Sequence, residues 1–454
     1  MKKKIHIIGI GGIAMSAIAQ YLLKQGYQLS GSDLKANQLT DKLAKLGVDI
    51  TIGHNKDNLP SNLELVIHSA AIPDNNIELV TAKKRGVKLM GRSQALAWLT
   101  DDKSVISVAG THGKTTTSGM IAHTLTVADY APNFIIGGIL SNFTSNYKIT
   151  GSDLFVLEGD EYNRSFLNYK TDLGVLLNIE FDHPDIYSDY DDLSATYQKY
   201  VEGLEELLIT NSKVIEQLNL KELDLDIDIW TVGIENNQAD FNAVEIQEKG
   251  FESFFVLEYN AKRVAEFRIP VLGEYNIKHA LETIAIARYF NISWSVLKTA
   301  LANWQGVERR FECLEKNSQR IVISDYAHHP SELKAASDDL ARIKTDKKKV
   351  LIFQPHQYIR TKELFADYKN LLKKDFDQII IQKIYSVREE VTTAKLEELG
   401  RDLADIIADN AKYYNSFVQL REFLVEYEKN NQAIYLFMGA GDIDDFARSW
   451  VGEG

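Results

Sequence analysis

The residues with the clearest chemical potential lie at positions 110–117, which read Gly-Thr-His-Gly-Lys-Thr-Thr-Thr. The apolar segment SVISVA precedes them, and the helix-forming segment SGMIAHTLT follows. In a strand–loop–helix setting, glycines free backbone amides to cradle phosphates, Lys114 neutralises the β and γ oxygens, and the Thr115 hydroxyl can ligate Mg²⁺. Val108 stands where the usual motif has its first glycine. We still predict a phosphate-binding loop for a nucleoside triphosphate.

Two further groups follow apolar strands of the same region. Glu158 ends the segment DLFVLE, with Asp160 and Glu161 just beyond it, and His183 lies just past the end of GVLLNIE. Parallel strands end at one edge of their sheet, so both groups are expected at the edge that carries the phosphate loop. There each could hold a Mg²⁺ ion that screens the γ-phosphate. Taken alone, either residue would be interpreted as a solvated loop side chain.

A second glycine turn lies near the start of the chain. Gly9, Gly11 and Ala14 have the spacing of a dinucleotide-binding turn, and Asp33 ends the next strand-like segment. The glycines let backbone amides approach a diphosphate at a helix N-terminus, and the carboxylate could hold ribose hydroxyls. This motif alone leaves NAD, FAD and a UDP-sugar open. A signal peptide is the competing interpretation of the lysine-led apolar start, but closely spaced glycines favour a strand-to-helix turn.

The last third of the chain carries a basic pair and two clusters that contain histidine. Arg309 and Arg310 lie where an arginine could cross between domains and grip a phosphate. The clusters DYAHHP at 325–330 and QPHQYIRT at 354–361 each follow an apolar strand. Zinc binding is disfavoured, because adjacent histidines usually diverge in a turn and no cysteine accompanies them at ligand spacing. Substrate hydrogen bonding or loop structure is the better interpretation.

Composition limits the kind of molecule that positions these groups. A chain of 454 residues exceeds one compact core, which predicts roughly two to four domains. The formal net charge of −13 disfavours nucleic acid and anionic lipid as partners. Apart from the apolar start of the chain, no stretch approaches the ~20 apolar residues of a membrane span. The single cysteine, Cys313, excludes an intramolecular disulfide. We expect a cytoplasmic protein without membrane insertion.

The order of strand-like and helical segments predicts three α/β domains in series. Residues 1–99 read as a Rossmann-like domain with a strand over 5–8 and a helix over 13–24. Residues 100–308 read as a central phosphate-loop domain, whose segment 241–272 has the pattern of an antiparallel meander. Residues 309–454 read as a second Rossmann-like domain with the strands RIVISDY, KKVLIFQ, FDQIIIQ and AIYLFMG.

The motifs together resemble the Mur ligase family over the whole chain and in the family's order. They are GIGGIAMS, GTHGKTTT, LEGDEYNRSF, NIEFDHPDIY, GEYN, ERRFE, DYAHHPSE and FQPHQYIRT. The resemblance implies an ATP- and Mg²⁺-dependent ligase of peptidoglycan precursor synthesis. It would join L-alanine to the carboxylate of UDP-N-acetylmuramate through an acyl phosphate, without a protein nucleophile and with closure of the third domain.

Two alternatives stay open. A recycling member of the family attaches the tripeptide L-Ala-γ-D-Glu-diaminopimelate to the same acceptor. An NAD-dependent dehydrogenase built on the first glycine turn is more remote, because it leaves the phosphate loop idle.

The resemblance also implies roles for single residues, with Lys114, Glu158, His183 and Arg310 as the catalytic set. ATP would contact Gly110, Thr111, His112, Gly113, Lys114, Thr115, Thr116, Asn276, Arg310 and Asp325. Mg²⁺ would be held by Thr115, Glu158 and His183. The UDP substrate would contact Gly9, Gly11, Gly12, Asp33, Ser69 and Arg92. The amino acid would contact His328, His356 and Arg360.

Three features depart from the family's pattern. His279 stands where a second asparagine would follow Asn276 by one helical turn, and Gln357 stands where some members have arginine. The segment DEYNRSF resembles the recycling ligase or some branches of the alanine-using ligases. FQPHQYIRT and MGAGDID resemble the alanine-using ligase instead. We expect L-alanine to be preferred, because a small amino acid needs the closed pocket that the C-terminal domain would supply.

Overall fold

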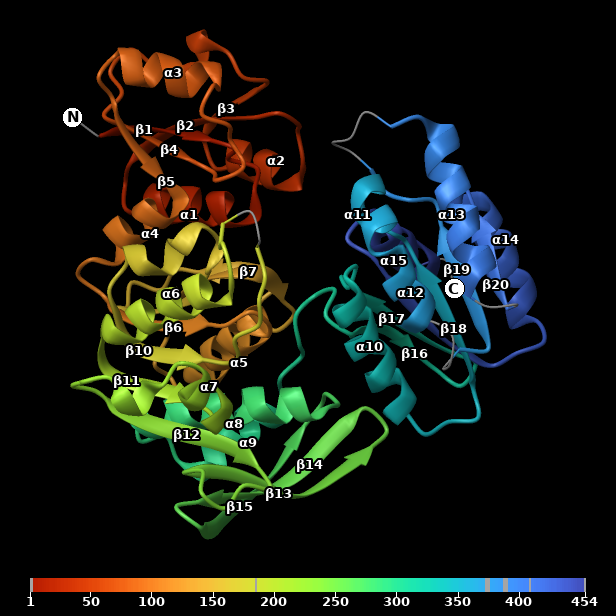
Figure 1. Ribbon diagram of the computed structural model, residues 1–454. Helices are drawn as coiled ribbons and strands as arrows, with labels where there is room; N and C mark the ends of the chain where they lie inside the picture. The colour runs from red at the N-terminus through yellow and green to blue at the C-terminus, as the bar shows by residue number, and fades with distance from the viewer. Residues whose placement is uncertain (1–2, 184–185, 372–375, 387–390, 408–409, 453–454) are drawn as a thin grey trace. The chain divides into compact units, whose positions relative to one another are not determined.

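The computed structural model describes residues 3–183, 186–371, 376–386, 391–407 and 410–452, and its chain forms two compact units (Figure 1). The first unit contains residues 1–247 and 252–305, and the second contains 248–251 and 306–454. Three sheets organise the chain, two in the first unit and one in the second. No helix within the described residues combines the length and apolarity that crossing a bilayer requires.

The N-terminal sheet has five parallel strands in the order β3-β2-β1-β4-β5. They are β1 (Lys4–Ile8), β2 (Gln28–Asp33), β3 (Asp49–Ile52), β4 (Leu65–His68) and β5 (Lys88–Gly91). The helices are α1 (Ile13–Lys24), α2 (Gln38–Lys45), α3 (Ile77–Lys84) and α4 (Arg92–Thr100), with a 3-10 turn η1 (Lys56–Asn58). The chain order reverses between β1 and β4, and in such sheets ligands bind beyond the carboxyl ends of those two strands.

The central sheet has ten strands in the order β15-β14-β13-β12-β11-β10-β6-β9-β7-β8. They are β6 (Ser104–Ala109), β7 (Asn133–Leu140), β8 (Ser145–Lys148), β9 (Leu154–Gly159), β10 (Thr171–Leu176), β11 (Leu204–Thr210), β12 (Asp228–Ile234), β13 (Phe241–Lys249), β14 (Glu252–Tyr259) and β15 (Lys262–Ile269). The helices are α5 (Lys114–Val127), α6 (Tyr190–Glu202), α7 (Ser212–Gln217), α8 (Glu274–Tyr289) and α9 (Trp294–Ala302), with 3-10 turns η2 (Tyr162–Asn168) and η3 (Leu220–Glu222).

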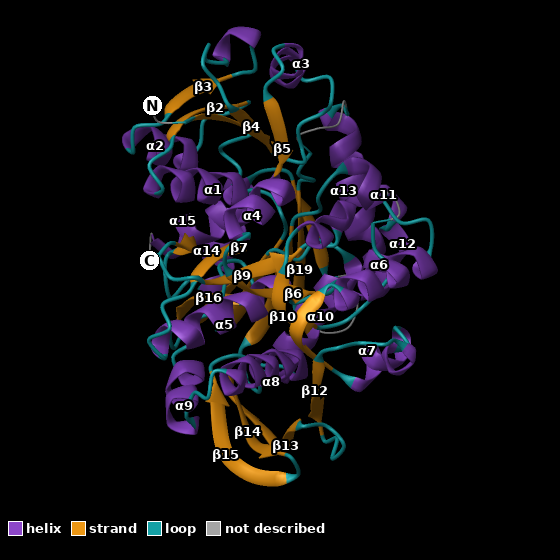
Figure 2. Cartoon of the chain, turned by 90° about the vertical axis from the view of Figure 1, so that its left-hand side faces the viewer, coloured by secondary structure: helices purple, strands orange, loops and turns teal. Residues whose placement is uncertain are grey.

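The segment expected to form a meander extends this central sheet. Strands β14 and β15 pair antiparallel, as the alternating pattern predicts, whereas β13 pairs parallel with β12. Figure 2 shows β13, β14 and β15 at the end of the first unit that lies away from the N-terminal sheet. These strands therefore lengthen the sheet at the edge remote from β6 and its loop.

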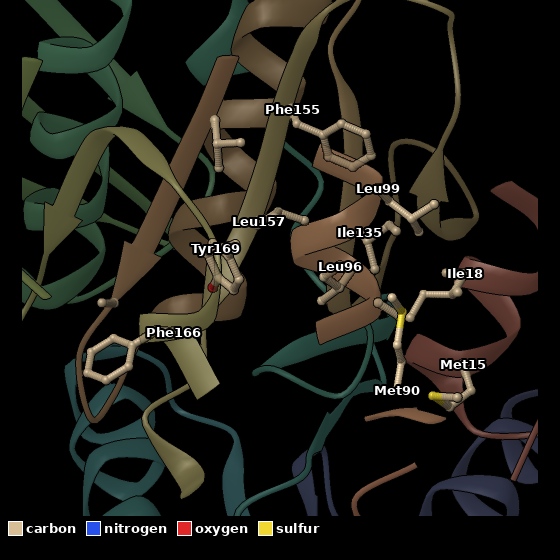
Figure 3. Packing of buried hydrophobic residues seen from close by; sticks show 14 of the residues in the cluster. Met15, Ile18, Met90, Leu96, Leu99, Ile135, Phe155, Leu157, Phe166 and Tyr169 are labelled. Atoms are coloured by element: carbon tan, nitrogen blue, oxygen red, sulfur yellow. The ribbon is translucent and has the colours of Figure 1, made fainter. Parts of the chain in front are cut away.

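The N-terminal and central sheets share one hydrophobic core (Figure 3). Met15, Ile18 and Leu99 from the N-terminal helices belong to the same buried cluster as Ile135 and Phe155 from β7 and β9. The ring of Tyr21 on α1 lies 5.7 Å from that of Phe155. Burial of this continuous apolar surface explains why two sheets with separate helices form a single compact unit.

The sheet of the second unit has six strands in the order β16-β17-β21-β18-β19-β20, and only β16 is antiparallel. They are β16 (Glu312–Lys316), β17 (Arg320–Asp325), β18 (Lys348–Phe353), β19 (Gln378–Gln382), β20 (Ala411–Tyr414) and β21 (Ala433–Met438). The helices are α10 (Pro330–Arg342), α11 (Tyr358–Glu363), α12 (Phe365–Leu371), α13 (Thr393–Ile407), α14 (Phe417–Glu428) and α15 (Ile443–Gly452). All four strands expected from the sequence are present, and β16 and β20 add short edges.

Candidate active site

The phosphate loop joins β6 to α5 and is built around two glycines. Gly110 and Gly113 have φ values of +135° and +88°, which residues with a Cβ rarely adopt. A Cβ on Gly113 would also lie only 2.7 Å from Nε2 of His279 on α8. Both the backbone conformation and the neighbouring imidazole therefore require glycine at position 113.

A segment that follows β10 holds the loop from the opposite side. The Asn178 side chain accepts from the amide of His112 and donates to its carbonyl, both at 2.9 Å. The Thr111 hydroxyl donates to the Glu180 carbonyl and accepts from the Glu180 amide. These bonds explain why β10 ends at Leu176, because the residues after it pair with the loop. His183 consequently lies farther beyond the strand than the sequence indicated.

Lys114 begins α5, and four protein oxygens lie within hydrogen-bond distance of its ammonium group. Nζ donates to the carbonyls of Gly110 at 2.6 Å and Thr111 at 3.1 Å. It also donates to both carboxylate oxygens of Glu161, at 2.7 and 3.0 Å. Glu161 is only 3% exposed, so this charge-assisted contact is shielded from water.

Glu158 lies near the end of β9 with a half-buried side chain. It accepts a hydrogen bond from the Gly137 amide at 2.7 Å, and the Thr115 side chain hydrogen-bonds to it. Burial raises the pKa of Glu158, although these hydrogen bonds and the charge of Lys114 act in the opposite direction. A carboxylate in this position is an anion that water stabilises poorly, so a cation beside it would be favoured.

His183 lies on the other side of Glu161. Its Nε2 is 3.6 Å from Oε1 of Glu161, and this contact raises the pKa of His183. The residue has a φ of +58°, and its carbonyl accepts from the amides of Ile186 and Tyr187. A left-handed non-glycine residue held by its surroundings is typical of functional sites. Lys114, Glu158, Glu161 and His183 thus gather at one edge of the central sheet.

The first glycine turn follows β1, and Ser69 follows β4, at the point where the strand order reverses. A Cβ on Gly9 would lie 3.1 Å from the Cβ of Ser69. Asp33 accepts a hydrogen bond from the Gly11 amide at 2.8 Å. The amides of Gly9 and Ile10 both donate to the Ser32 carbonyl. The turn is therefore a tightly bonded structure in its own right.

The backbone donors left for a ligand lie one step further along the chain. The Gly12 amide donates to the Gly9 carbonyl, so each amide from Gly9 to Gly12 has a protein acceptor. Within the described residues, the amides of Ile13, Ala14 and Met15 in the first turn of α1 have none. A helix N-terminus of this kind attracts anions.

Arg92 lies at the start of α4 and forms an ion pair with Asp160 in the loop after β9. The neighbouring Ser93 accepts a hydrogen bond from Asn168 at 3.1 Å. These contacts join the start of α4 to the segment after β9 that carries Glu161. The sequence did not reveal that this arginine has a protein carboxylate as its partner.

Asn276 and His279 lie in the first turns of α8. Asn276 donates from its side chain to the Leu272 carbonyl at 2.6 Å. His279 Nδ1 lies 3.2 Å from the buried carboxylate of Glu282, whose pKa is raised by burial. The imidazole thus lies between Glu282 and Gly113. Where the family pattern would have an asparagine, this chain has a histidine that contacts the phosphate loop.

In the second unit, Asp325 ends β17 and organises the turn that follows. Its carboxylate accepts from the amides of Phe311 and Ala327, both at 2.7 Å. Burial raises the pKa of Asp325 to about 6, although the charge of Arg310 acts in the opposite direction. The Arg310 guanidinium lies 5.7 Å from the ring centroid of Tyr326. Asp325 and Arg310 therefore share one neighbourhood.

His328, His356 and Arg360 also come together in this unit. The two imidazole rings lie 5.6 Å apart edge to face, and the His356 ring stacks on Tyr385. Burial lowers the pKa of His328, whose Nδ1 lies 3.1 Å from the Tyr326 carbonyl. The charge of Arg360 acts on His328 as well. A neutral imidazole beside a guanidinium can bind a small carboxylate.

Comparison with known proteins adds the family. Residues 4–104 match the Mur ligase family catalytic domain, 108–287 the Mur ligase middle domain, and 309–441 the Mur ligase glutamate ligase domain. The UDP-N-acetylmuramate–L-alanine ligase of Clostridium perfringens is 36% identical over 98% of this chain and 96% of its own length. The chain belongs to the Mur ligase family.

Solved structures agree with this assignment. The UDP-N-acetylmuramate–alanine ligase of Thermotoga maritima superposes on this Mur ligase with a TM-score of 0.82 and 26% identity, over 99% of this chain and 98% of that one. A murein peptide ligase from Psychrobacter arcticus gives a TM-score of 0.69 at 22% identity over 99% and 98% of the two chains. The second match shows the fold alone. This Mur ligase has the three-domain α/β organisation that the sequence predicts.

Sequence reasoning missed several residues that shape the site of this Mur ligase. Glu161 bonds to Lys114, Asn178 holds the phosphate loop, and Gly137 donates to Glu158. Glu161 and Asn178 both stand inside motifs quoted above, and an acidic residue beside a phosphate loop was a usable signal. Gly137 lies in mid-strand with no signal of its own. Arg309 donates to the carbonyls of two glycines that follow β21, and its guanidinium, like that of Arg310, lies near the Tyr326 ring.

Proposed function

We propose that this Mur ligase uses ATP to join L-alanine to the carboxylate of UDP-N-acetylmuramate, in the cytoplasm and in peptidoglycan precursor synthesis. The observation that carries the proposal is the meeting of Lys114, Glu158 and His183 at the carboxyl edge of the central sheet. That edge suits phosphoryl transfer. The substrates follow from the 36% identity to a ligase named for these substrates.

The proposal divides the work between the domains. Residues 1–99 would bind the UDP moiety at the switch point of the N-terminal sheet, near Gly9, Gly11, Gly12, Asp33 and Ser69. Residues 100–308 would bind ATP at the phosphate loop, with Asn276 at the base. Residues 309–454 would bring Arg310 and Asp325 to the phosphates, and His328, His356 and Arg360 to the carboxylate of L-alanine.

The residues at the phosphate loop fit a Mg²⁺ ion. The Thr115 side chain lies beside the half-buried Glu158 carboxylate, and Mg²⁺ prefers such oxygen ligands. No group of three or more His, Cys, Asp or Glu side chains among the described residues is arranged to hold a metal by itself. Such an ion would therefore take further ligands from phosphate and water, with His183 close by. Bound Mg²⁺ would neutralise charge on the β- and γ-phosphates.

The chemistry proceeds in two displacements. A carboxylate oxygen of the muramyl group attacks the γ-phosphorus, which forms an acyl phosphate and releases ADP. The amine of L-alanine then attacks the acyl carbon, phosphate leaves, and loss of a proton gives the amide. The first step brings together two anions that repel each other, so Lys114 and the free amides of α5 must stabilise the charge that develops. Arg310 would add charge from the second unit.

A phosphate-release assay tests this function. The enzyme, ATP and Mg²⁺ are combined with UDP-N-acetylmuramate and L-alanine, and each component is omitted in turn. We expect release that depends on all of them, together with a product whose mass equals that of the two substrates less water. Release without UDP-N-acetylmuramate, or turnover with NAD instead of ATP, would contradict the proposal.

A further inference from the structure

Glu161 is a buried carboxylate between Lys114 and His183, and the two displacements described above give it no part. Its side chain is 4% exposed. Its backbone carbonyl accepts from the hydroxyl of Tyr187 at 2.5 Å, and Tyr187 is itself buried. The backbone of Glu161 is therefore held in place, and its side chain has little room because it is buried.

Lys114 has no spare hydrogen-bond donor in this arrangement. A lysine ammonium has three N–H groups, and here they face two loop carbonyls and the Glu161 carboxylate. A phosphate oxygen that binds Lys114 must therefore displace one of these acceptors. Glu161 is the acceptor whose negative charge competes directly with phosphate for the same cation.

Glu161 also has a second possible hydrogen-bond donor within reach, the imidazole of His183. Nε2 of His183 lies 3.6 Å from Oε1, the oxygen that also accepts from Lys114 at 3.0 Å. A buried carboxylate that loses its only cation is strongly destabilised, and a remaining partner reduces that cost. His183 would supply this compensation when Lys114 moves to the phosphate.

We propose that Glu161 is a positioning residue. Its carboxylate holds Lys114 away from the phosphate site, and it pairs with His183 instead when the nucleotide binds. In this exchange Lys114 leaves one anion for another, and Glu161 then fixes the His183 ring beside the acceptor carboxylate. Nucleotide binding thereby orders the acceptor side of the site. The inference rests on the proposed function, because it assumes that the triphosphate occupies the loop at 110–117.

Glu161→Gln separates this role from a merely structural one. The amide keeps the shape and removes the charge that competes for Lys114, so ADP should bind about fivefold to tenfold more tightly by calorimetry. Ligation turnover should fall about tenfold or more, because His183 loses its anionic partner. Loss of structural support would instead weaken binding and turnover together.

Glu180→Gln is the matched control. Glu180 lies at the same loop, and its carboxylate is 3.4 Å from Nε2 of His112 with a side chain that is 56% exposed. Its removal takes the same charge from the site without touching Lys114. An equal gain in ADP affinity from both variants would show that charge alone is responsible and would overturn the proposal.

A double-mutant cycle completes the test. In a Lys114→Ala background, Glu161→Gln should no longer improve ADP binding, because no lysine ammonium is left for Glu161 and the phosphate to compete for. If the Gln variant does not melt cooperatively, Glu161→Asp replaces it, and we expect a smaller gain in the same direction. Unchanged or weaker ADP binding, or turnover equal to that of the unmodified enzyme, would overturn the exchange. The cycle uses ADP alone, so its failure is distinct from a failure of the ligation assay.

Discussion

The two glycine loops of the first unit occupy similar positions in their sheets but differ in the charged side chains around them. Each loop follows a buried parallel strand, β1 or β6, and each leads into a helix whose first amides have no acceptor among the residues that the structure describes. The central loop adds Lys114, and Thr115, Glu158 and Glu161 lie around it. The first turn has Asp33, which bonds to the turn itself, and Arg92, which pairs with Asp160.

This difference separates binding from chemistry. Helix amides and a dipole are sufficient to hold a diphosphate that does not react. A γ-phosphate under attack by a carboxylate needs cationic side chains or a metal ion as well, because negative charge builds up as the two anions meet. Glycine spacing alone does not distinguish the two loops; the charged side chains around them do.

Lys114→Ala should abolish the ligation chemistry that distinguishes the central loop from the first glycine turn. We expect turnover to fall roughly 10³-fold or more, since the variant loses the positive charge that the loop itself supplies. The chain should still fold, but the melting temperature should fall, because the buried Glu161 carboxylate loses its lysine partner. Lys103→Ala, at the opposite end of β6 and paired with Asp153, is the control. Near-normal turnover of the Lys114 variant would refute the loop assignment.

Glu158→Gln should have the next largest effect. The amide keeps the bond to the Gly137 amide but removes the half-buried charge beside Thr115. We expect turnover to fall about 10²-fold and the Mg²⁺ concentration for half-maximal activity to rise. Titration of activity against Mg²⁺ checks both. A large loss of turnover with an unchanged Mg²⁺ requirement would argue against a metal ligand.

A pair of alanine substitutions compares the loops directly. Gly113→Ala meets both a φ of +88° and the His279 ring, so KM for ATP should rise about tenfold while affinity for UDP-N-acetylmuramate stays the same. Gly11→Ala meets the ends of the Asn37, Thr40 and Asp33 side chains, at 2.9 to 3.0 Å. These can shift, so only the UDP substrate should bind more weakly, by a few-fold. If Gly113→Ala weakened binding of UDP-N-acetylmuramate, or Gly11→Ala raised KM for ATP, the assignment of one ligand to each loop would be wrong.

The smallest effect concerns the support beneath the first turn. Burial alone would raise the pKa of Glu78, but the close contact with His6 and hydrogen bonds from Ser32 and Asn58 outweigh it and lower that pKa to about 2. A carboxylate with a depressed pKa stabilises the fold above its unfolded value of 4.5, and this contribution is lost as the pH falls towards 2. Glu78→Gln should therefore lower the melting temperature at pH 7 and flatten its decline in acid. An unchanged acid profile would show that this cluster does not govern it.

The sequence predicted elements better than it predicted partners. The helix over 13–24, the strands that lead into both loops and the four apolar strands of the second unit follow from periodicity and glycine punctuation. The parallel pairing of β13 and the early end of β10 depend on tertiary contacts, such as those of Asn178. The Lys114–Glu161 pair could not be derived, because spacing indicates which edge a side chain occupies and not which neighbour it bonds. The shared core of the first two sheets was missed for the same reason.

The central claim is that this Mur ligase builds a new precursor from L-alanine. Its most direct test is the ratio of kcat/KM for L-alanine to that for L-Ala-γ-D-Glu-diaminopimelate, with ATP, Mg²⁺ and UDP-N-acetylmuramate saturating. We predict a ratio well above one, with glycine and L-serine reacting slowly, because a methyl-sized pocket discriminates by only about 1–3 kcal/mol. A higher kcat/KM for the tripeptide would contradict the account and assign the enzyme to recycling.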